Sequence, residues 1–238
     1  MSYIENPKTK GSGIICAIPQ TGTCPQKCSD CFFQSGRSYL EPLDDNLPNL
    51  PSLSEAEGRI VRVNDGNDSN YQKTKVIAST NSYKDRFFNT SFKDLDFPAP
   101  VVLTLNPAGK TDESFWKIEE IPENLMFVRF RSNTWNIYLL DEAIKYYTEK
   151  KVPIILTFMA YYNEEETIPQ EHKRYYKFKK RTLNSYWVLT QEGFDLITCH
   201  FIDNPYVYTC GKNANTHPCQ RCGNCIREYF NTKERMRK

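Results

Sequence analysis

Nine cysteines gather near the two ends of the chain, and residues 32 to 198 contain none. A disulfide framework is usually spread along a chain, and an odd number of cysteines would leave one thiol over. Bunched cysteines in an intracellular protein are more typical of metal ligation. The two groups therefore predict two metal sites. The expected ligands are Cys24, Cys28 and Cys31 in the first site and Cys210, Cys219, Cys222 and Cys225 in the second.

Net charge and hydropathy bear on the expected partners and cellular location of the protein. The 238 residues include 31 Lys and Arg against 29 Asp and Glu, so bulk charge does not require an anionic partner. No run of eighteen apolar residues occurs, and the first ten residues lack the layout of a secretory signal. We expect a cytoplasmic protein with no membrane partner.

Short apolar runs alternate with polar stretches along the chain, which predicts an α/β fold. The expected strands are 14–18, 59–63, 75–79, 101–105, 125–131 and 152–159. The expected helices are 54–57, 83–88 and 139–150. Strands joined in order through helices favour a parallel sheet with right-handed crossovers. Reactive groups of such sheets gather at the carboxyl ends of the strands, so the residues after each run are the candidates for a site.

The first cysteine group follows the first expected strand with the spacing C-x3-C-x2-C. Three thiolates on one loop can ligate three irons of a 4Fe-4S cubane and leave the fourth iron open. An open iron can be chelated by a cofactor that carries its own amino and carboxylate groups. A zinc site or a set of unligated thiols is the alternative, although zinc usually takes four protein ligands in a structural site.

Cys24, Cys28 and Cys31 resemble the signature of the radical S-adenosylmethionine superfamily. The resemblance implies a partial (β/α)6 barrel, a catalytic 4Fe-4S cluster, S-adenosylmethionine as cofactor and an electron donor such as flavodoxin or ferredoxin. It also implies cleavage of the cofactor to methionine and a 5′-deoxyadenosyl radical that takes hydrogen from a substrate. Many members carry an aromatic residue before the third cysteine. This chain has Asp30 there, so Phe33 becomes the expected aromatic contact of the cofactor.

Polar residues follow the second and fourth expected strands. The resemblance implies that Asp65 and Gly66, with Asn64 beside them, bind the methionine amino group of the cofactor. An ordinary Asn/Asp/Gly turn is the alternative. Asn106 follows the fourth expected strand, where it is a candidate for a ribose hydroxyl or for a turn before Pro107.

Two arginines share one face of the fifth expected strand. Arg129 and Arg131 lie amid apolar neighbours, and buried cations need partners. One of them is expected to bind the carboxylate of methionine or of substrate. The alternative is a structural ion pair with Glu119 or Glu120.

The second cysteine group has the spacing C-x8-C-x2-C-x2-C. Four thiolates suit a zinc ion or a fully ligated cluster equally well by number. Successive x2 steps favour an auxiliary 4Fe-4S cluster over zinc, whose structural sites usually pair two separate knuckles. We expect a barrel over residues 1–198 and a Cys-rich metal-binding extension over 199–238.

Residues 171–181 interleave cations with aromatic residues. This pattern suits a nucleic-acid surface, and equally a helix with charges outward and aromatic residues inward. A nucleotide or nucleic-acid substrate is favoured over a peptide or protein on this basis. A contrasting function is a non-catalytic nucleic-acid-binding module with zinc at both cysteine groups.

Overall fold

The computed structural model describes residues 2–22, 24–26, 28, 40, 47–107, 113–158, 160–162, 167–180, 185–210 and 219–238. The chain divides into two compact units. The first comprises residues 1–104, 121–127 and 218–238, and the second comprises residues 105–120 and 128–217. In the described ranges, no helix has the length and apolar character needed to cross a membrane.

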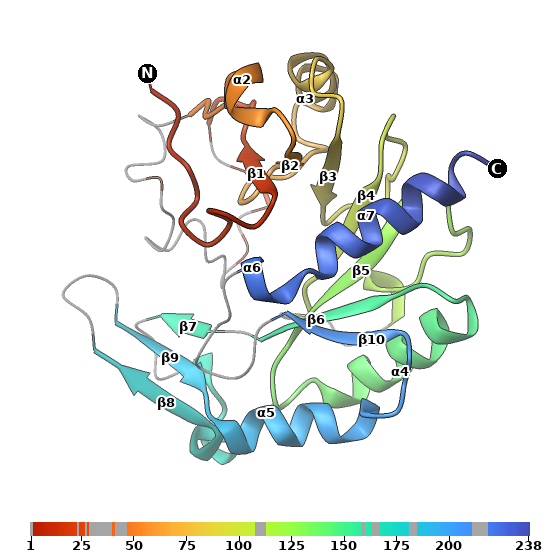
Figure 1. Ribbon diagram of the computed structural model, residues 1–238. Helices are drawn as coiled ribbons and strands as arrows, with labels where there is room; N and C mark the ends of the chain where they lie inside the picture. Colours follow the sequence, from red (N-terminus) through yellow and green to blue (C-terminus); the bar gives the residue numbers. More distant parts are fainter. Residues whose placement is uncertain are drawn as a thin grey trace. The chain divides into compact units, whose positions relative to one another are not determined.

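The first unit is built on parallel strands (Figure 1). These are β1 (Ile14–Ala17), β2 (Ile60–Val63), β3 (Arg86–Thr90), most of β4 (Val101–Leu105) and the start of β5 (Leu125–Ser132). They follow one another in sequence order across the sheet. The register pairs Cys16 with Arg62 and Arg62 with Phe87, so these three side chains share one face of the sheet. The helices of this unit are α2 (Leu53–Ala56), α3 (Lys73–Thr80), α6 (Cys219–Cys222) and α7 (Asn224–Arg235).

The second unit contains the later part of β5 and further parallel strands. Strand β6 (Ile154–Phe158) pairs with β5 on one side and with β10 (Val207–Cys210) on the other. A separate antiparallel sheet has the order β7-β9-β8, from β7 (Ala160–Tyr162), β8 (Tyr176–Lys179) and β9 (Tyr186–Leu189). The helices are α4 (Ile137–Glu149) and α5 (Gln191–Thr198), with 3-10 turns at Glu113–Phe115, Gln170–Tyr175 and Cys199–Phe201.

The predicted α/β class with a parallel sheet is confirmed. Two of the predicted helices, α2 and α4, form for reasons that can be read in their own sequence. Helix α2 starts at a capping box in which Ser52 and Glu55 satisfy each other's main-chain N–H groups. Helix α4 buries an apolar stripe at helical spacing, as the sequence predicts. The buried residues of α4 are Leu139, Leu140, Ala143, Ile144 and Tyr147.

Two predicted elements are wrong: one predicted strand lies in a helix, and one predicted helix overlaps a strand. The expected strand 75–79 lies within helix α3, whose buried residues Val76 and Thr80 are four apart, as on one helical face. The expected helix 83–88 gives way to β3, where Phe87 and Phe88 are buried on opposite faces of the sheet. Strand β3 lies between β2 and β4, and burial on both faces outweighs local propensity there.

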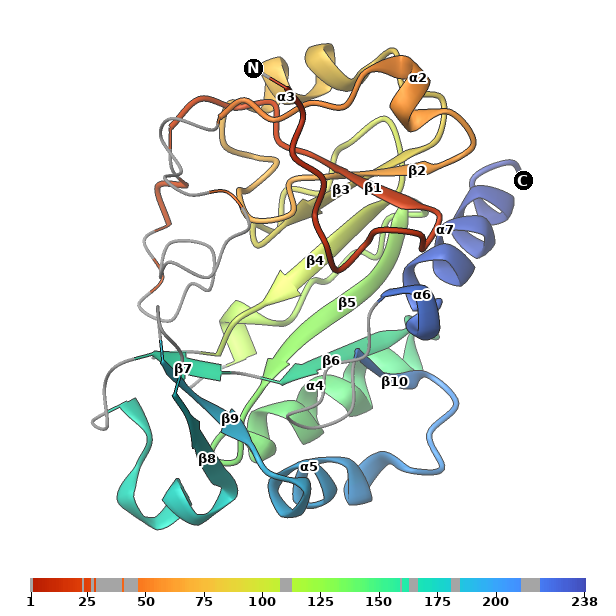
Figure 2. The same ribbon diagram turned by 60° about the vertical axis from the view of Figure 1, so that its left-hand side comes forward.

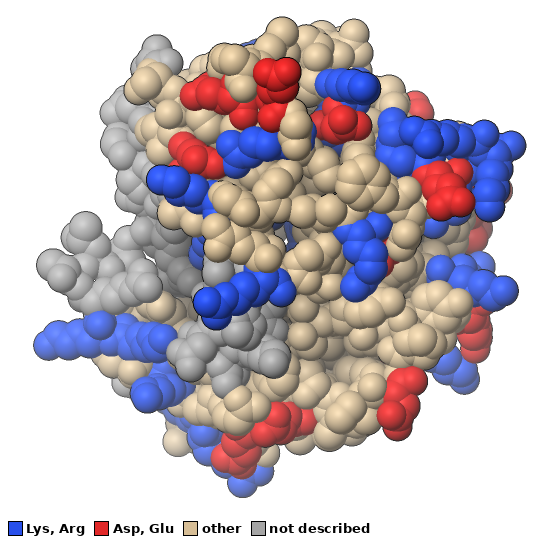
Figure 3. Space-filling view, in the orientation of Figure 1, with Lys and Arg blue, Asp and Glu red and all other residues tan. Residues whose placement is uncertain are grey.

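The alternative of an α-helix over the basic aromatic stretch does not hold for its described residues. A 3-10 turn at Gln170–Tyr175 leads into strand β8. Basic side chains gather elsewhere too, over the carboxyl end of α7 in Figure 3, but acidic side chains lie among the basic ones across the face in view. Charge on that face therefore does not by itself identify an anionic partner.

Candidate functional site

Gln20 anchors the segment that follows β1. Its side chain is fully buried, and its amide nitrogen donates to the main-chain oxygens of Asp68 (2.7 Å) and Tyr71 (3.1 Å). Two carbonyl acceptors fix the orientation of this amide, so its oxygen is the free end. In the described part of the chain, that buried oxygen has no hydrogen-bond partner. A buried acceptor without a donor is costly, and it marks a place where a donor group of a ligand would fit.

A second such oxygen lies after β2. Asn64 is buried with φ of 63°, and its amide nitrogen donates to Ser69 Oγ at 2.9 Å. Within the described residues, its Oδ1 has no partner. Gly66 then adopts φ of 146°, a backbone region that favours glycine. Since Gln20 and Asn64 both bond the Asp68–Ser69 turn, the ends of β1 and β2 are joined around these two acceptors.

Asp68 ties this turn to the end of β3. Its carboxylate accepts hydrogen bonds from Thr90 Oγ1 (2.8 Å), from Ser91 N and Oγ (2.7 Å each) and from Asn70 N (2.9 Å). Four donors on one buried carboxylate hold the turn rigidly. The carboxyl ends of β1, β2 and β3 therefore form one hydrogen-bonded polar cluster in the first unit.

Cys24 and Cys28 follow Gln20 of this cluster along the chain, and both are partly exposed. The preceding segment is tied to the same loop, because Asn67 Nδ2 donates to Gly22 O at 3.1 Å and Gln72 Nε2 donates to Thr21 O at 3.3 Å. The third predicted ligand, Cys31, and the predicted aromatic contact, Phe33, lie outside the described residues. The eight described cysteines form no disulfide.

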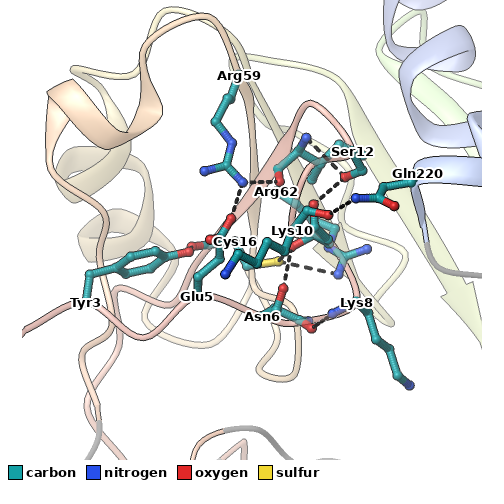
Figure 4. Close-up of polar contacts among 12 residues, drawn as sticks. Tyr3, Glu5, Asn6, Lys8, Lys10, Ser12, Cys16, Arg59, Arg62 and Gln220 are labelled. Carbon is teal, nitrogen blue, oxygen red and sulfur yellow. Dashed lines mark hydrogen bonds and ion pairs between the residues drawn. The ribbon is translucent and has the colours of Figure 1, made fainter.

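Asp65 is engaged by protein groups on both carboxylate oxygens, and its partners Arg62, Cys16 and Asn6 are labelled in Figure 4. Arg62 Nη2 lies 2.6 Å from Oδ1, and Oδ2 accepts from Asn6 Nδ2 and from the Cys16 thiol at 3.3 Å. Arg62 Nη2 also donates to Cys16 Sγ at 3.4 Å. The Arg62 and Asp65 side chains are only 11% and 14% exposed. We call Arg62, Asp65 and Cys16 the buried triad.

Electrostatics within the buried triad keep Arg62 charged and Cys16 protonated. Burial disfavours the Arg62 cation, but the Asp65 carboxylate outweighs burial and holds the pKa of Arg62 well above its ordinary value. Burial raises the pKa of the Cys16 thiol to about 12, against the lowering effect of Arg62. Cys16 is therefore a neutral thiol at physiological pH.

The other predicted cofactor contacts lie in the second unit. Asn106 directly follows β4 and is half-buried. Arg129 and Arg131 are half-buried on one face of β5, in register with Ile155 and Thr157 of β6. Strand β5 confirms the prediction that the two arginine side chains share one face.

The second cysteine group is divided between the two units. Cys210 ends β10 in the second unit, whereas Cys219, Cys222 and Cys225 lie on α6 and α7 in the first. Cys219 N donates to Lys8 O at 3.0 Å, and Gln220 Nε2 donates to Lys10 O at 2.7 Å. The N-terminal segment accordingly lies beside α6 in both Figure 1 and Figure 2.

Helix α7 fixes these cysteines to the sheet. Tyr229 is fully buried, its ring lies 6.4 Å from that of Phe87, and its hydroxyl donates to Asp85 Oδ1 at 3.0 Å. Arg235 continues the attachment through hydrogen bonds to the Glu123 and Leu125 carbonyls. Helix α7 thus covers the sheet face that carries Cys16 and Arg62.

Sequence reasoning missed Gln20, Asp68 and Arg62, although all three lie within two residues of a predicted site position or strand end. A Gln after an apolar strand and an Arg inside one were the available signals. Among the described residues, no three His, Cys, Asp or Glu side chains are grouped as metal ligands. No protein-family model, curated protein or solved structure matches the chain.

Proposed function

We propose that this chain is a radical S-adenosylmethionine enzyme. The observation that carries the proposal is the position of the cysteine triplet, whose described members Cys24 and Cys28 lie in the segment that follows the first strand of a parallel sheet. The carboxyl ends of the neighbouring strands supply a polar cluster with two unpaired buried acceptors. Ligand sites of parallel α/β sheets lie at such strand ends.

We further infer that the sheet is the partial (β/α)6 barrel of this superfamily. Strands β1 to β6 follow one another in sequence order, and the pairs β1–β2, β2–β3, β3–β4 and β5–β6 are parallel. A doubly wound sheet would reverse its order at a switch point. Sequential order is the topology of (β/α) barrels, and it supports this assignment.

The donor set at the first group suits a 4Fe-4S cluster, with Cys24, Cys28 and Cys31 as its thiolate ligands. When bound, such a cluster supplies the electron that cleaves the cofactor to methionine and a 5′-deoxyadenosyl radical. The chain's own contribution is to hold the cofactor in place and to keep water from the reactive groups.

The unpaired oxygens of Gln20 and Asn64 are the best candidates to accept hydrogen bonds from the cofactor's amino group. Asp65 lies beside them, but its two oxygens are already engaged by Arg62, Asn6 and Cys16. We therefore assign Asp65 an indirect role, with Gly66 shaping the turn. Asn106 remains the candidate for ribose. Arg129 or Arg131 remains the candidate for a carboxylate, and Phe33 for the adenine.

Cys210, Cys219, Cys222 and Cys225 are proposed to hold the auxiliary 4Fe-4S cluster. Thiolates suit both iron-sulfur clusters and zinc, so the donor chemistry fits either group. Three of the four proposed ligands lie within seven residues of one another, on α6 and at the start of α7.

For the substrate we propose a nucleotide or nucleic acid, with a peptide as the competing class. On β8, Phe178 is 48% exposed and its ring lies 5.3 Å from that of Trp187 on β9. Lys177 and Lys180 beside it are exposed. Exposed rings flanked by cations suit base stacking and phosphate binding. Retention of single-stranded RNA that falls when Phe178 is changed to Ala, but not when exposed Tyr138 is changed, would support this class.

Production of 5′-deoxyadenosine tests the proposed function. Anaerobically reconstituted protein with S-adenosylmethionine and dithionite should form the nucleoside, and Cys28→Ala should abolish it. Cys199→Ala, at an exposed cysteine outside both groups, is the matched control and should retain the activity. Retained production in Cys28→Ala would overturn the proposal. Stoichiometric zinc without sulfide would instead support a non-catalytic nucleic-acid-binding module.

A further inference from the structure

We infer that four side chains of the second unit bind a single unstacked nucleobase of the substrate. These residues are Trp135, Tyr161, His172 and Tyr176, and we call them the aromatic cluster. The inference rests on the proposed nucleotide or nucleic-acid substrate and deepens it, because it names the residues that hold the base.

The aromatic cluster lies at the carboxyl ends of two paired parallel strands. Ser132, which ends β5, is in register with Phe158, which ends β6. Trp135 comes three residues after β5, and Tyr161 comes three residues after β6. Ligand sites of parallel α/β sheets lie at this edge, so the aromatic cluster occupies a position where a substrate is expected.

Ring contacts join all four side chains. The ring centroid of Trp135 lies 5.2 Å from that of Tyr161, 5.7 Å from that of His172 and 5.8 Å from that of Tyr176. The rings of Tyr161 and Tyr176 are 5.6 Å apart. Both tyrosines are buried, whereas Trp135 and His172 are half-buried. Trp135 is therefore the ring that contacts the other three and still retains accessible surface.

Hydrogen bonds fix the turn that carries Trp135. Oδ1 of buried Asn133 accepts the main-chain N–H groups of Trp135 (3.1 Å) and Asn136 (2.9 Å). Asn133 Nδ2 donates to the Tyr161 hydroxyl at 3.0 Å, and Asn136 Oδ1 accepts the main-chain N–H of Asn133 at 3.1 Å. A ring held in this way is preorganised for stacking, because little further ordering accompanies ligand binding.

Polar atoms of the aromatic cluster and of neighbouring Thr134 are left without partners. Within the described residues, His172 Nδ1, the Tyr176 hydroxyl and Thr134 Oγ1 are buried and make no hydrogen bond. Burial raises the pKa of Tyr176 and Thr134 opposes that increase, so these two hydroxyls lie close together without the geometry of a hydrogen bond. Buried polar groups are almost always paired, so these atoms indicate a ligand with donors and acceptors at its edge.

A nucleobase satisfies this combination of ring surface and polar atoms. Its faces stack on aromatic side chains, and its edge pairs with groups such as hydroxyls and imidazoles. An aliphatic ligand would leave the buried polar atoms unpaired, which is costly for each of them. Residues 172–180 also contain five Lys and Arg and no Asp or Glu, and such a basic segment suits the phosphates that accompany a base.

The small antiparallel sheet connects the aromatic cluster to the exposed ring of Phe178 (Figure 1). Tyr161 and Phe178 both lie opposite Trp187 of β9, so these three side chains share one face of the sheet. Tyr176 lies two residues before Phe178 on β8, which places it on the same face. This row of rings suits a single strand whose neighbouring base stacks on Phe178 while one base enters the aromatic cluster.

Oligonucleotide binding tests the inference without turnover. Labelled single-stranded oligoadenylate and oligouridylate are titrated with the reconstituted full chain in the absence of reductant, and fluorescence anisotropy gives Kd. Trp135→Leu should raise Kd about 5–150-fold, the range expected for loss of one stacked base. Trp135→Phe keeps a ring and should recover most of the affinity. Tyr138→Leu is the control, because Tyr138 is an exposed ring on α4 outside the aromatic cluster.

Tyr176→Phe separates binding from folding. It removes only a hydroxyl that makes no hydrogen bond within the described residues, so stability in denaturant should not fall. Loss of a hydrogen bond to the base should nevertheless raise Kd about 2–10-fold. Tyr138→Phe makes the same chemical change at an exposed position and should alter neither quantity.

Three results would overturn the inference. Native protein that binds neither oligonucleotide would exclude a nucleobase and favour the peptide class. Native affinity in a folded Trp135→Leu protein would exclude stacking on this ring. Native affinity in Tyr176→Phe would exclude its hydroxyl from the base edge. The proposed radical chemistry is judged separately, because 5′-deoxyadenosine formation without added substrate should persist in Trp135→Leu and depends on the first cysteine group.

Discussion

The two cysteine groups are held in different ways. The segment before Cys24 and Cys28 is held by side-chain hydrogen bonds from Gln20, Asn67 and Gln72, and neither cysteine lies in a helix or strand. Cys219 and Cys222 lie on α6 and Cys225 lies on α7, whose Tyr229 is buried against the sheet.

The way in which each cysteine group is held suits the function proposed for it. A catalytic cluster must admit a cofactor at an open iron, so polar tethers with unpaired acceptors suit a site that is completed by the ligand. An auxiliary centre needs fixed ligands, so a packed helix suits it. The first region should therefore respond to polar substitutions, and the second to losses of packing.

The largest expected effect is on the packed region. Tyr229→Ala should lower the free energy of unfolding by about 3–5 kcal/mol, because it removes a fully buried aromatic ring and its hydrogen bond to Asp85. Denaturant unfolding of the metal-free protein measures this. The neighbouring Phe230 on α7 is 59% exposed, and Phe230→Ala should change stability by less than about 1 kcal/mol. Equal effects of the two changes would mean that α7 does not anchor the cysteines.

A smaller effect is expected on the polar tethers. Gln20→Ala should cost about 1–3 kcal/mol, because the buried carbonyls of Asp68 and Tyr71 lose their shared donor. It should also weaken binding of S-adenosylmethionine, measured by titration of the reconstituted protein. Lys75→Ala removes an exposed contact to Thr21 in the same region and should leave both quantities nearly unchanged. Normal cofactor affinity in Gln20→Ala would exclude its oxygen from the amino-group site.

The last effect vanishes near neutral pH and appears only in alkaline solution, as a pH dependence from the buried triad. Burial raises the pKa of Cys16 from 9.0 to about 12, so the folded state keeps a proton that the unfolded state releases. The resulting stability is fully present below pH 9 and is lost as pH rises from about 9 to 12. Between pH 9 and 11, unfolding free energy should fall about 1.4 kcal/mol per pH unit more steeply in the native protein than in Cys16→Ala. Parallel curves for the two proteins would show that water reaches the triad.

Much of the sheet could be predicted from the sequence, because buried parallel strands are recognisable as short apolar runs. The regions around α3 and β3 could not, since Val76 and Ile77 resemble strand residues while Arg86 and Asn89 border the apolar pair of β3. Whether each of these segments forms a helix or a strand is decided by its tertiary burial, which local propensity does not encode.

Part of the candidate site could likewise be predicted from the sequence, and part could not. Cysteine spacing and strand-end polarity identified the region of Cys24 and Asn64, because both patterns are local. The partners of Asp65 were not predictable, since Asn6 and Cys16 meet it through contacts across 59 and 49 residues. The contact between Arg62 and Cys16 likewise joins residues that are 46 positions apart in the chain.

The most direct test of the central claim is the electron paramagnetic resonance spectrum of the reduced first cluster. A protein with Cys219→Ala, Cys222→Ala and Cys225→Ala removes the second centre, so the remaining signal belongs to Cys24, Cys28 and Cys31. The account predicts a 4Fe-4S signal that changes when S-adenosylmethionine is added, because the cofactor binds the open iron. A signal that stays the same with saturating cofactor would contradict the account.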